Sequence, residues 1–192
     1  MIVGVLGLQG AVREHIRSLE RLDVATRPVK RTRDLDGLDG LVLPGGESST
    51  MALLAGNGIF DRLRALAKEG LPMFGTCAGM ILLAAEAEGR RGPGLDAIDI
   101  TVARNASGRQ VDSFETTLVV EGIGEDVPAV FIRAPYVTRV GDRVVPMAWH
   151  EGVVVMAREG NVLAASFHPE LTDDLRVHRY FIEELVEKED NR

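Results

Sequence analysis

The sequence has few aromatic residues, a single cysteine and no long apolar run. Of its 192 residues, 5% are aromatic and one, Cys77, is a cysteine. No disulfide can form within the chain, and nothing indicates an oxidising compartment. No apolar run reaches the about 18 residues that a membrane span needs. Lys and Arg number 22 against 29 Asp and Glu, giving a net charge of -7, which argues against general nucleic-acid binding. Because the N-terminus also lacks a basic leader, we expect a cytoplasmic protein.

The apolar pattern predicts parallel β-α units followed by a strand-rich second half. Continuous apolar runs predict buried strands over residues 2–8, 40–44 and 72–75, with a short extended stretch over 26–30. Amphipathic spacing predicts helices over residues 11–22, 49–54, 59–69 and 174–188. Further strands are expected in quick succession, over residues 98–104, 114–120, 129–133, 144–148, 152–158 and 161–167. We therefore expect one α/β domain over residues 1–192, a flavodoxin-like three-layer sandwich with a mostly parallel, mixed central sheet flanked by helices.

The sole cysteine lies in a pattern typical of a nucleophile. Cys77 is the centre of a Gly-Thr-Cys-Ala-Gly run that follows an apolar strand and precedes a helical pattern. Cysteine thus stands where the nucleophile elbow of α/β hydrolases has serine. The flanking Gly75 and Gly79 permit close strand–helix packing and a strained turn. The positive end of the following helix favours the thiolate. A buried cysteine that only fills space in the core is the alternative interpretation.

A cysteine nucleophile needs a base, and the base needs an orienting group. Of the four histidines, His15 and His178 fall on predicted helices and His150 at a strand end, so we expect them at surface or helix-cap positions. His168 instead follows an apolar strand, at the sheet edge where ligand sites of parallel α/β proteins form. Glu170, two residues later, would face the same way and orient the imidazole. A solvated His-Pro turn is the alternative. The histidines lack metal-ligand spacing, so no metal is expected.

Four further strand ends carry residues suited to an acyl-transfer site. Gly45 and Gly46 follow a buried strand and precede a helical pattern, so their backbone N–H groups would stabilise an oxyanion. A phosphate loop is the rival interpretation, but no Gly-Lys-Ser/Thr follows. Gln9 holds a comparable place after the first strand. Arg104 and Arg133 end other strands and would be able to grip a carboxylate, although a lone arginine is usually a solvated surface residue.

These motifs together resemble the class I glutamine amidotransferases, whose glutaminase domain carries a Cys-His-Glu triad, and within them the glutaminase subunits of pyridoxal 5′-phosphate synthase. The matching segments follow in order over nearly the whole chain, at residues 5–11 with 14–15, 43–51, 75–79, 104–105 with 108–110 and 112–115, 131–135, and 167–171. The resemblance implies a catalytic triad in which Cys77 is the nucleophile, His168 is the base and Glu170 is the orienting carboxylate. It implies an L-glutamine site formed by Gly45, Gly46, Glu47, Arg104, Ile132 and Arg133. It implies an oxyanion region at Gln9, Gly46 and Ala78.

The resemblance also implies hydrolysis of L-glutamine to glutamate and ammonia, without a cofactor. The ammonia would pass to a (β/α)8-barrel synthase subunit, in an assembly of twelve subunits of each kind. One departure is that Ser107 stands where the family usually has a bulky aromatic, which bears on the loop after Arg104. Two alternatives stay open at this point. One is a cysteine hydrolase or redox sensor on the same fold with no preference for glutamine, and the other is a non-catalytic binding subunit.

Overall fold

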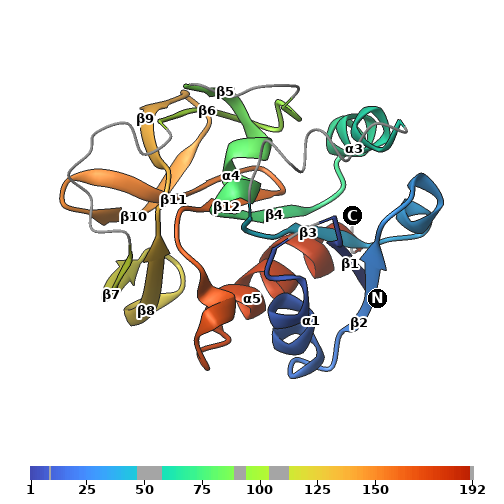
Figure 1. Ribbon diagram of the computed structural model, residues 1–192, viewed down its shortest axis with the longest axis horizontal. Helices are drawn as coiled ribbons and strands as arrows, with labels where there is room; N and C mark the ends of the chain where they lie inside the picture. The colour runs from blue at the N-terminus through green and yellow to red at the C-terminus, as the bar shows by residue number, and fades with distance from the viewer. Residues whose placement is uncertain (9, 47–57, 89–93, 104–112, 191–192) are drawn as a thin grey trace.

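A curved mixed sheet forms the centre of the molecule (Figure 1). The structure is a computed structural model that describes residues 1–8, 10–46, 58–88, 94–103 and 113–190. The first strands, which alternate with helices, are β1 (Ile2–Leu6), β2 (Ala25–Val29), β3 (Gly40–Leu43), β4 (Met73–Thr76), β5 (Ala84–Ala87) and β6 (Ile98–Ala103). The later strands are β7 (Ser113–Val120), β8 (Gly124–Ile132), β9 (Tyr136–Val140), β10 (Val145–His150), β11 (Val153–Glu159) and β12 (Val162–Ala165).

The helices lie on both faces of this sheet (Figure 1). The longer α-helices are α1 (Val12–Glu20) and α3 (Ile59–Lys68), and a shorter one, α4 (Ala78–Leu83), follows β4 directly. Single 3₁₀ turns are η1 (Thr32–Leu35) and η2 (Pro169–Leu171). The chain closes with a continuous helical segment made of α5 (Arg176–Tyr180), the π-helical η3 (Phe181–Val186) and α6 (Glu187–Asp190).

The strand order places β4, which leads to Cys77, beside β12, which leads to His168. In the large sheet the order is β2-β1-β3-β4-β12-β11-β9-β6-β5, with β10 paired to β11, while β7 and β8 form a separate hairpin. From β2 to β12 all neighbours are parallel, and Thr76 of β4 lies opposite Ala165 of β12. Because adjacent parallel strands end at the same edge, the residues that follow β4 and β12 emerge together. The mostly parallel, mixed sheet flanked by helices that the sequence predicted is therefore confirmed.

Two apolar clusters fill the spaces on the two faces of the sheet. One joins α3 and α4 to the sheet through residues such as Leu63 and Met80, both fully buried. The other joins α1, the C-terminal helix and the β7–β8 hairpin through residues such as Leu19, Phe181 and Phe131. Each cluster excludes water from one side of the parallel strands, which explains why those strands are continuous apolar runs in the sequence.

Some elements differ from the sequence-based expectation. The short strands β5 and β9 were not predicted. The sequence of β5 is Ala-Ala-Glu-Ala, a helix-favouring composition that parallel pairing with β6 overrides. The C-terminal helix expected over 174–188 is present but passes through a π turn. Strand β11 turns into β12 through a tight hairpin with Gly160 at φ 55°. The helix expected over 49–54 lies outside the described residues.

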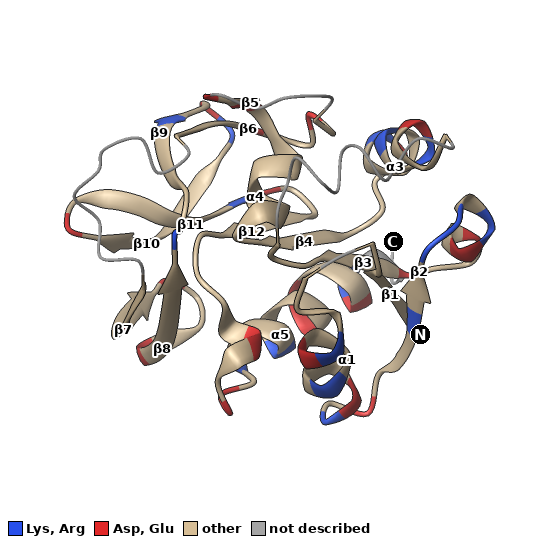
Figure 2. Ribbon diagram, viewed as in Figure 1, with Lys and Arg blue, Asp and Glu red and all other residues tan. Residues whose placement is uncertain are grey.

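Charges of both signs alternate on the outer surfaces of the helices. Figure 2 shows acidic and basic positions interspersed along α1 and α3. Their apolar faces point toward the sheet, as the buried Leu19 and Leu63 show. Among the helices of the described ranges, we find none with both the length and the apolar character that crossing a bilayer requires.

Candidate active site

Cys77 occupies a strained turn between β4 and α4. Its backbone has φ 49° and ψ −105°, a conformation rare for a residue with a side chain, and its N–H donates to the carbonyl of Ala165 at 2.8 Å. The two flanking glycines are required sterically. A Cβ on Gly75 would lie 2.6 Å from the backbone of Gly79, and one on Gly79 would lie 1.9 Å from the carbonyl oxygen of Leu43. The strand and helix therefore approach too closely for any side chain at either position, and this packing holds the cysteine in its turn.

His168 lies beside Cys77 at the same edge of the sheet. Shortly after β12 ends, its N–H donates to the carbonyl of Val130 in β8 at 2.8 Å, which ties the segment to the β7–β8 hairpin. Its Nδ1 donates to Oε1 of Glu170 at 2.7 Å, and the imidazole is close enough to Cys77 for the sulfur to raise its pKa. Both His168 and Glu170 are buried. With Nδ1 committed to the carboxylate, Nε2 is the nitrogen left for the sulfur.

Charge coupling within this group favours an imidazolium. Burial alone would lower the pKa of His168, but its hydrogen bonds to Cys77 and Glu170 and the charges of these groups raise it to about 10. Burial alone would raise the pKa of Glu170, but attraction to His15, which carries a second proton only at acidic pH, and the hydrogen bond from His168 lower it below its ordinary value. The carboxylate is thus ionised at neutral pH, and the histidine beside the sulfur is positively charged.

The Gly45-Gly46 loop covers the cysteine and the histidine. A Cβ on Gly45 would lie 2.3 Å from Cε1 of His168 and 3.3 Å from Cβ of Cys77. A Cβ on Gly10 would lie 1.5 Å from the carbonyl oxygen of Gly45, so the loop after β1 presses on this loop in turn. Gly46 has φ 149°, a value that residues with side chains rarely adopt. Backbone, and not side chains, therefore forms this wall of the site.

The end of β8 forms another wall. The sulfur of Cys77 lies 3.9 Å from the carbonyl oxygen of Ile132. The next residue, Arg133, has φ 43°, in the left-handed region, so the chain turns sharply beside the sulfur. Ala78, directly after Cys77, is the first residue of α4 and is buried. The remaining predicted site residues, and the departure at position 107, lie outside the described residues: Gln9, Glu47, Arg104 and Ser107.

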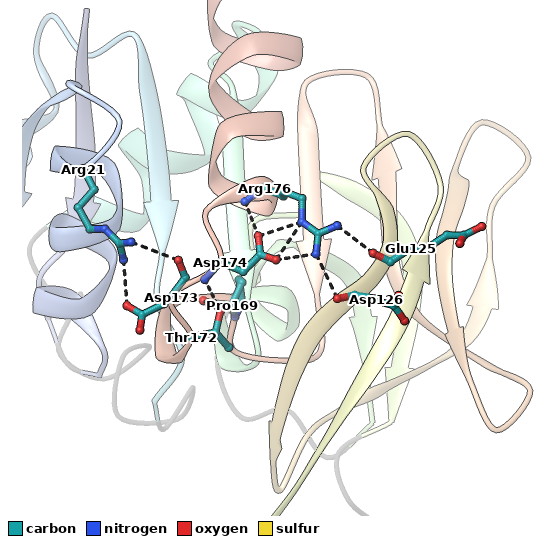
Figure 3. A network of polar contacts seen from close by, with 8 residues as sticks. All are labelled: Arg21, Glu125, Asp126, Pro169, Thr172, Asp173, Asp174 and Arg176. Atoms are coloured by element: carbon teal, nitrogen blue, oxygen red, sulfur yellow. Dashed lines mark hydrogen bonds and ion pairs between the residues drawn. The ribbon is translucent and has the colours of Figure 1, made fainter.

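A polar clamp holds the segment after Glu170 (Figure 3). The guanidinium of Arg176 donates to the carboxylate of Asp174 and to the backbone carbonyls of Glu125 and Asp126 in β8. On the other side, Arg21 at the end of α1 donates to Asp173 at 3.2 Å. The clamp joins α1 and the β7–β8 hairpin to the loop that follows the His-Pro-Glu run, and it thereby limits how far that loop can move.

The expectation that His15 and His178 lie at the surface was wrong. Both are fully buried between α1, α5 and the sheet, with His15 Nδ1 3.0 Å from His178 Nε2. The sequence did contain a sign that these two histidines are buried. His15 lies four residues before Leu19 and three after Val12, and His178 lies three residues before Phe181, so both histidines share the apolar stripe of their helix.

His150 and Thr76 are two further positions with contacts that the sequence did not reveal. The ring of His150, at the end of β10, stacks on Phe114 and Phe131, with centroids 5.0 and 5.5 Å away. Thr76, directly before Cys77, is fully buried, and its Oγ1 accepts the N–H of Gly45 at 3.2 Å. A polar side chain at the last position of an otherwise apolar strand was the only sign of this second contact.

The fold and this site together define a cysteine-dependent acyl-transfer enzyme on an α/β sheet. A strained cysteine at a helix start lies beside a histidine that a buried carboxylate orients. Comparison with known proteins narrows this class. Residues 5–187 match the model of the SNO glutamine amidotransferase family, and the chain belongs to that family. The family and activity class that the motifs implied are therefore confirmed.

The chain is also similar to individual members over nearly its whole length. It is 53% identical to the pyridoxal 5'-phosphate synthase subunit PdxT of Halalkalibacterium halodurans, over 96% of this chain and 95% of that protein. It is 55% identical to the subunit of the same name from Bacillus cereus, with the same coverage. A crystal structure of a glutamine amidotransferase, 48% identical, superimposes with a TM-score of 0.91 and covers 97% of this chain and 100% of that one.

Proposed function

We propose that this chain is the glutaminase subunit of a pyridoxal 5′-phosphate synthase, with Cys77 as nucleophile, His168 as acid–base group and Glu170 as the orienting carboxylate. The observation that carries the proposal is the cysteine elbow beside a buried His–Glu pair, in a chain of the glutamine amidotransferase family. The names of the similar PdxT proteins support the synthase as the destination of the ammonia. The proposal treats residues 1–192 as one glutaminase domain and places it in the cytoplasm, where a thiol stays reduced.

The reaction follows from the geometry of these groups. The Cys77 thiolate, whose proton His168 holds as an imidazolium, attacks the side-chain carboxamide carbon of L-glutamine, and the carbonyl π electrons move to the oxygen. The imidazolium of His168 then protonates the amide nitrogen, the C–N bond breaks, and ammonia leaves. Water, deprotonated by the same imidazole, attacks the γ-glutamyl thioester and releases glutamate and the sulfur. Glu170 keeps the imidazole oriented and balances its charge in both steps.

Attack by the sulfur and attack by water each produce a tetrahedral intermediate with a negatively charged oxygen. We assign the stabilisation of this oxyanion to backbone N–H groups near Gly46 and Ala78, in a region that also includes Gln9. Each such donor commonly contributes about 3–4 kcal/mol to transition-state stabilisation. Ala78 begins a helix, so its N–H has no intrahelical acceptor. Gly46, in a conformation open to glycine, is able to rotate its peptide toward or away from the site.

The substrate site extends from this region along the end of β8. We assign the binding of L-glutamine to a set of loop residues that comprises Gly45, Gly46, Glu47, Arg104, Ile132 and Arg133. Support comes from the position of Ile132, whose carbonyl lies 3.9 Å from the sulfur, and from the sharp turn at Arg133. An arginine in that turn is suited to the α-carboxylate of the substrate, because a guanidinium makes two parallel hydrogen bonds to a carboxylate.

The partner in this proposal is a (β/α)8-barrel synthase subunit, in an assembly of twelve subunits of each kind. Hydrolysis without the partner would waste glutamine. The Gly45-Gly46 loop offers a gate, because a peptide flip between two glycines has little steric cost. We expect glutamate release to be slow for the isolated chain and faster when the synthase subunit docks. Equal rates with and without the synthase subunit would exclude the gate while leaving the triad untouched.

The triad is tested by Cys77→Ala in the presence of the synthase subunit. The variant should bind glutamine and stay folded, and its glutamate release should fall to background. An electrophilic glutamine analogue should label the wild-type cysteine, and L-glutamine should compete with it. Labelling that glutamine does not reduce would favour a cysteine hydrolase or redox sensor of other specificity. Normal ammonia supply by Cys77→Ala would favour a non-catalytic subunit.

A further inference from the structure

A buried pair of histidines lies directly behind the site, and the mechanism above does not use it. His15 on α1 and His178 on α5 are both 0% exposed. His15 Nε2 lies 3.0 Å from Oγ1 of Thr76 and 3.4 Å from Oε2 of Glu170, and His15 Nδ1 lies 3.0 Å from His178 Nε2. The ring of His178 packs edge-on against Phe74. Two imidazoles without exposed surface are expensive to bury, so their polar contacts require an explanation.

Both histidines are neutral in the folded protein. Burial lowers the pKa of His15, and the positive charge of His168 adds to this effect, while the carboxylates of Glu170 and Glu14 oppose it. Burial and the nearby His15 lower the pKa of His178 to about 3. Each imidazole therefore carries one N–H, and the contacts decide on which nitrogen it lies.

Only one arrangement of the two hydrogens satisfies the contacts. If His15 carries its hydrogen on Nε2, it donates toward Glu170 Oε2 and Thr76 Oγ1, and its Nδ1 accepts from His178 Nε2. The reverse arrangement would point a His15 lone pair at the carboxylate. It would also leave a buried N–H on His178 Nδ1, which has no hydrogen-bond partner among the described residues. An orphaned N–H is more costly than an unpaired lone pair, so the first arrangement is favoured.

We propose that His15, held in one tautomer by His178, is a positioning residue that fixes Glu170 and, through Thr76, the Gly45 backbone. Glu170 Oε1 is taken by His168 at 2.7 Å, and Oε2 has no strict hydrogen bond in the described part of the chain. His15 Nε2 faces Oε2 at 3.4 Å.

The second branch reaches the loop above the cysteine. Thr76 Oγ1 accepts from Gly45 N at 3.2 Å and faces His15 Nε2 at 3.0 Å. One imidazole thus contacts both the carboxylate that orients the base and the residue that anchors the oxyanion loop. This inference rests on the roles proposed for the triad, and it predicts an effect on the rate of the chemical steps more than on the affinity for glutamine.

The test measures glutamate release from L-glutamine with the synthase subunit present. His15→Leu removes the donor and should lower kcat by at least about tenfold, with KM changed less than about twofold, because a misplaced catalytic group slows chemistry at unchanged binding. His15→Gln returns an N–H near the position of Nε2 and should recover most of the loss. His178→Leu removes the group that holds His15 in one tautomer. It should lower kcat by a smaller factor than His15→Leu, again with little change in KM.

Leu19→Ala is the matched control. Leu19 lies one turn from His15 on the same buried face of α1, and its side chain belongs to the apolar cluster on that face of the sheet. This variant should unfold more easily yet keep its kcat. The proposal is overturned if folded His15→Leu keeps the wild-type kcat, or if Leu19→Ala loses as much activity as His15→Leu, since a general loosening of α1 would then explain both results.

Nitrogen NMR of histidine-labelled wild-type protein keeps the proposal testable if the variants do not fold. A hydrogen on Nε2 of His15 over the neutral pH range supports it, and a hydrogen on Nδ1 refutes it. Different results test the proposed function and the role of the histidine pair. If the wild-type complex releases no glutamate, the proposed function fails, whereas normal turnover by the wild type and by folded His15→Leu refutes only the role of the histidine pair.

Discussion

The buried histidine pair makes the stability of this protein depend on pH in a predictable direction. Burial, with a smaller effect from His15, lowers the pKa of His178 from 6.5 to about 3 in the folded chain. Between these two pH values the unfolded chain binds a proton that the folded chain does not. The contribution of neutral His178 is therefore complete above about pH 6.5 and is lost as the pH falls toward 3.

The size of the effect follows from the same shift. Each pH unit in this window removes about 1.4 kcal/mol of unfolding free energy per histidine. Acidification from about pH 6.5 to about pH 4.5 should thus cost about 3 kcal/mol from His178 alone. The pKa of His15 is shifted in the same direction, so it adds to the loss. Against a typical total of about 5–15 kcal/mol, such a loss is large.

Urea denaturation at a series of pH values measures this dependence. In His178→Phe an aromatic ring replaces the imidazole beside Phe74, and the variant should lose stability less steeply on acidification than the wild type. Leu19→Ala should be less stable by the same amount at every pH, because it removes no titrating group. Parallel curves for wild type and His178→Phe would refute the assignment of a neutral buried histidine.

Three further outcomes are expected. Gly79→Ala would place a Cβ 1.9 Å from the carbonyl oxygen of Leu43, so it should cost about 3 kcal/mol or more in urea denaturation and abolish glutamate release; a stable, active variant would disprove the close packing. Gly46→Ala should stay folded but lose most activity with the synthase subunit, because φ 149° is poorly accessible to alanine; full activity would argue against the glycine gate. Arg176→Ala should lower the melting temperature, and Arg176→Lys should restore only part of it, because lysine cannot reach Asp174 and two carbonyls at once; equal melting temperatures for all three proteins would show that the clamp of Figure 3 contributes nothing.

The sequence alone determined the elements whose physics is local. A glycine on each side of Cys77, after an apolar strand and before a helix, was enough to predict the elbow, because the steric demand of that turn is met within a few residues. His168 and Glu170 were placed together for the same reason, since two residues of chain separate them. The alternation of apolar strands and helices likewise fixed the parallel half of the sheet.

Tertiary structure alone decided the surroundings of those groups. Strand pairing put β4 next to β12 and so brought positions 77 and 168 to one edge. Packing of α1 and α5 on the sheet buried His15 and His178, and although both lie on the apolar stripe of their helix, the stripe does not specify which groups the imidazoles contact. A side chain with two possible environments takes the one that its neighbours in space impose, and those neighbours lie far away in the sequence: His15 meets Thr76, Glu170 and His178 only in the folded chain.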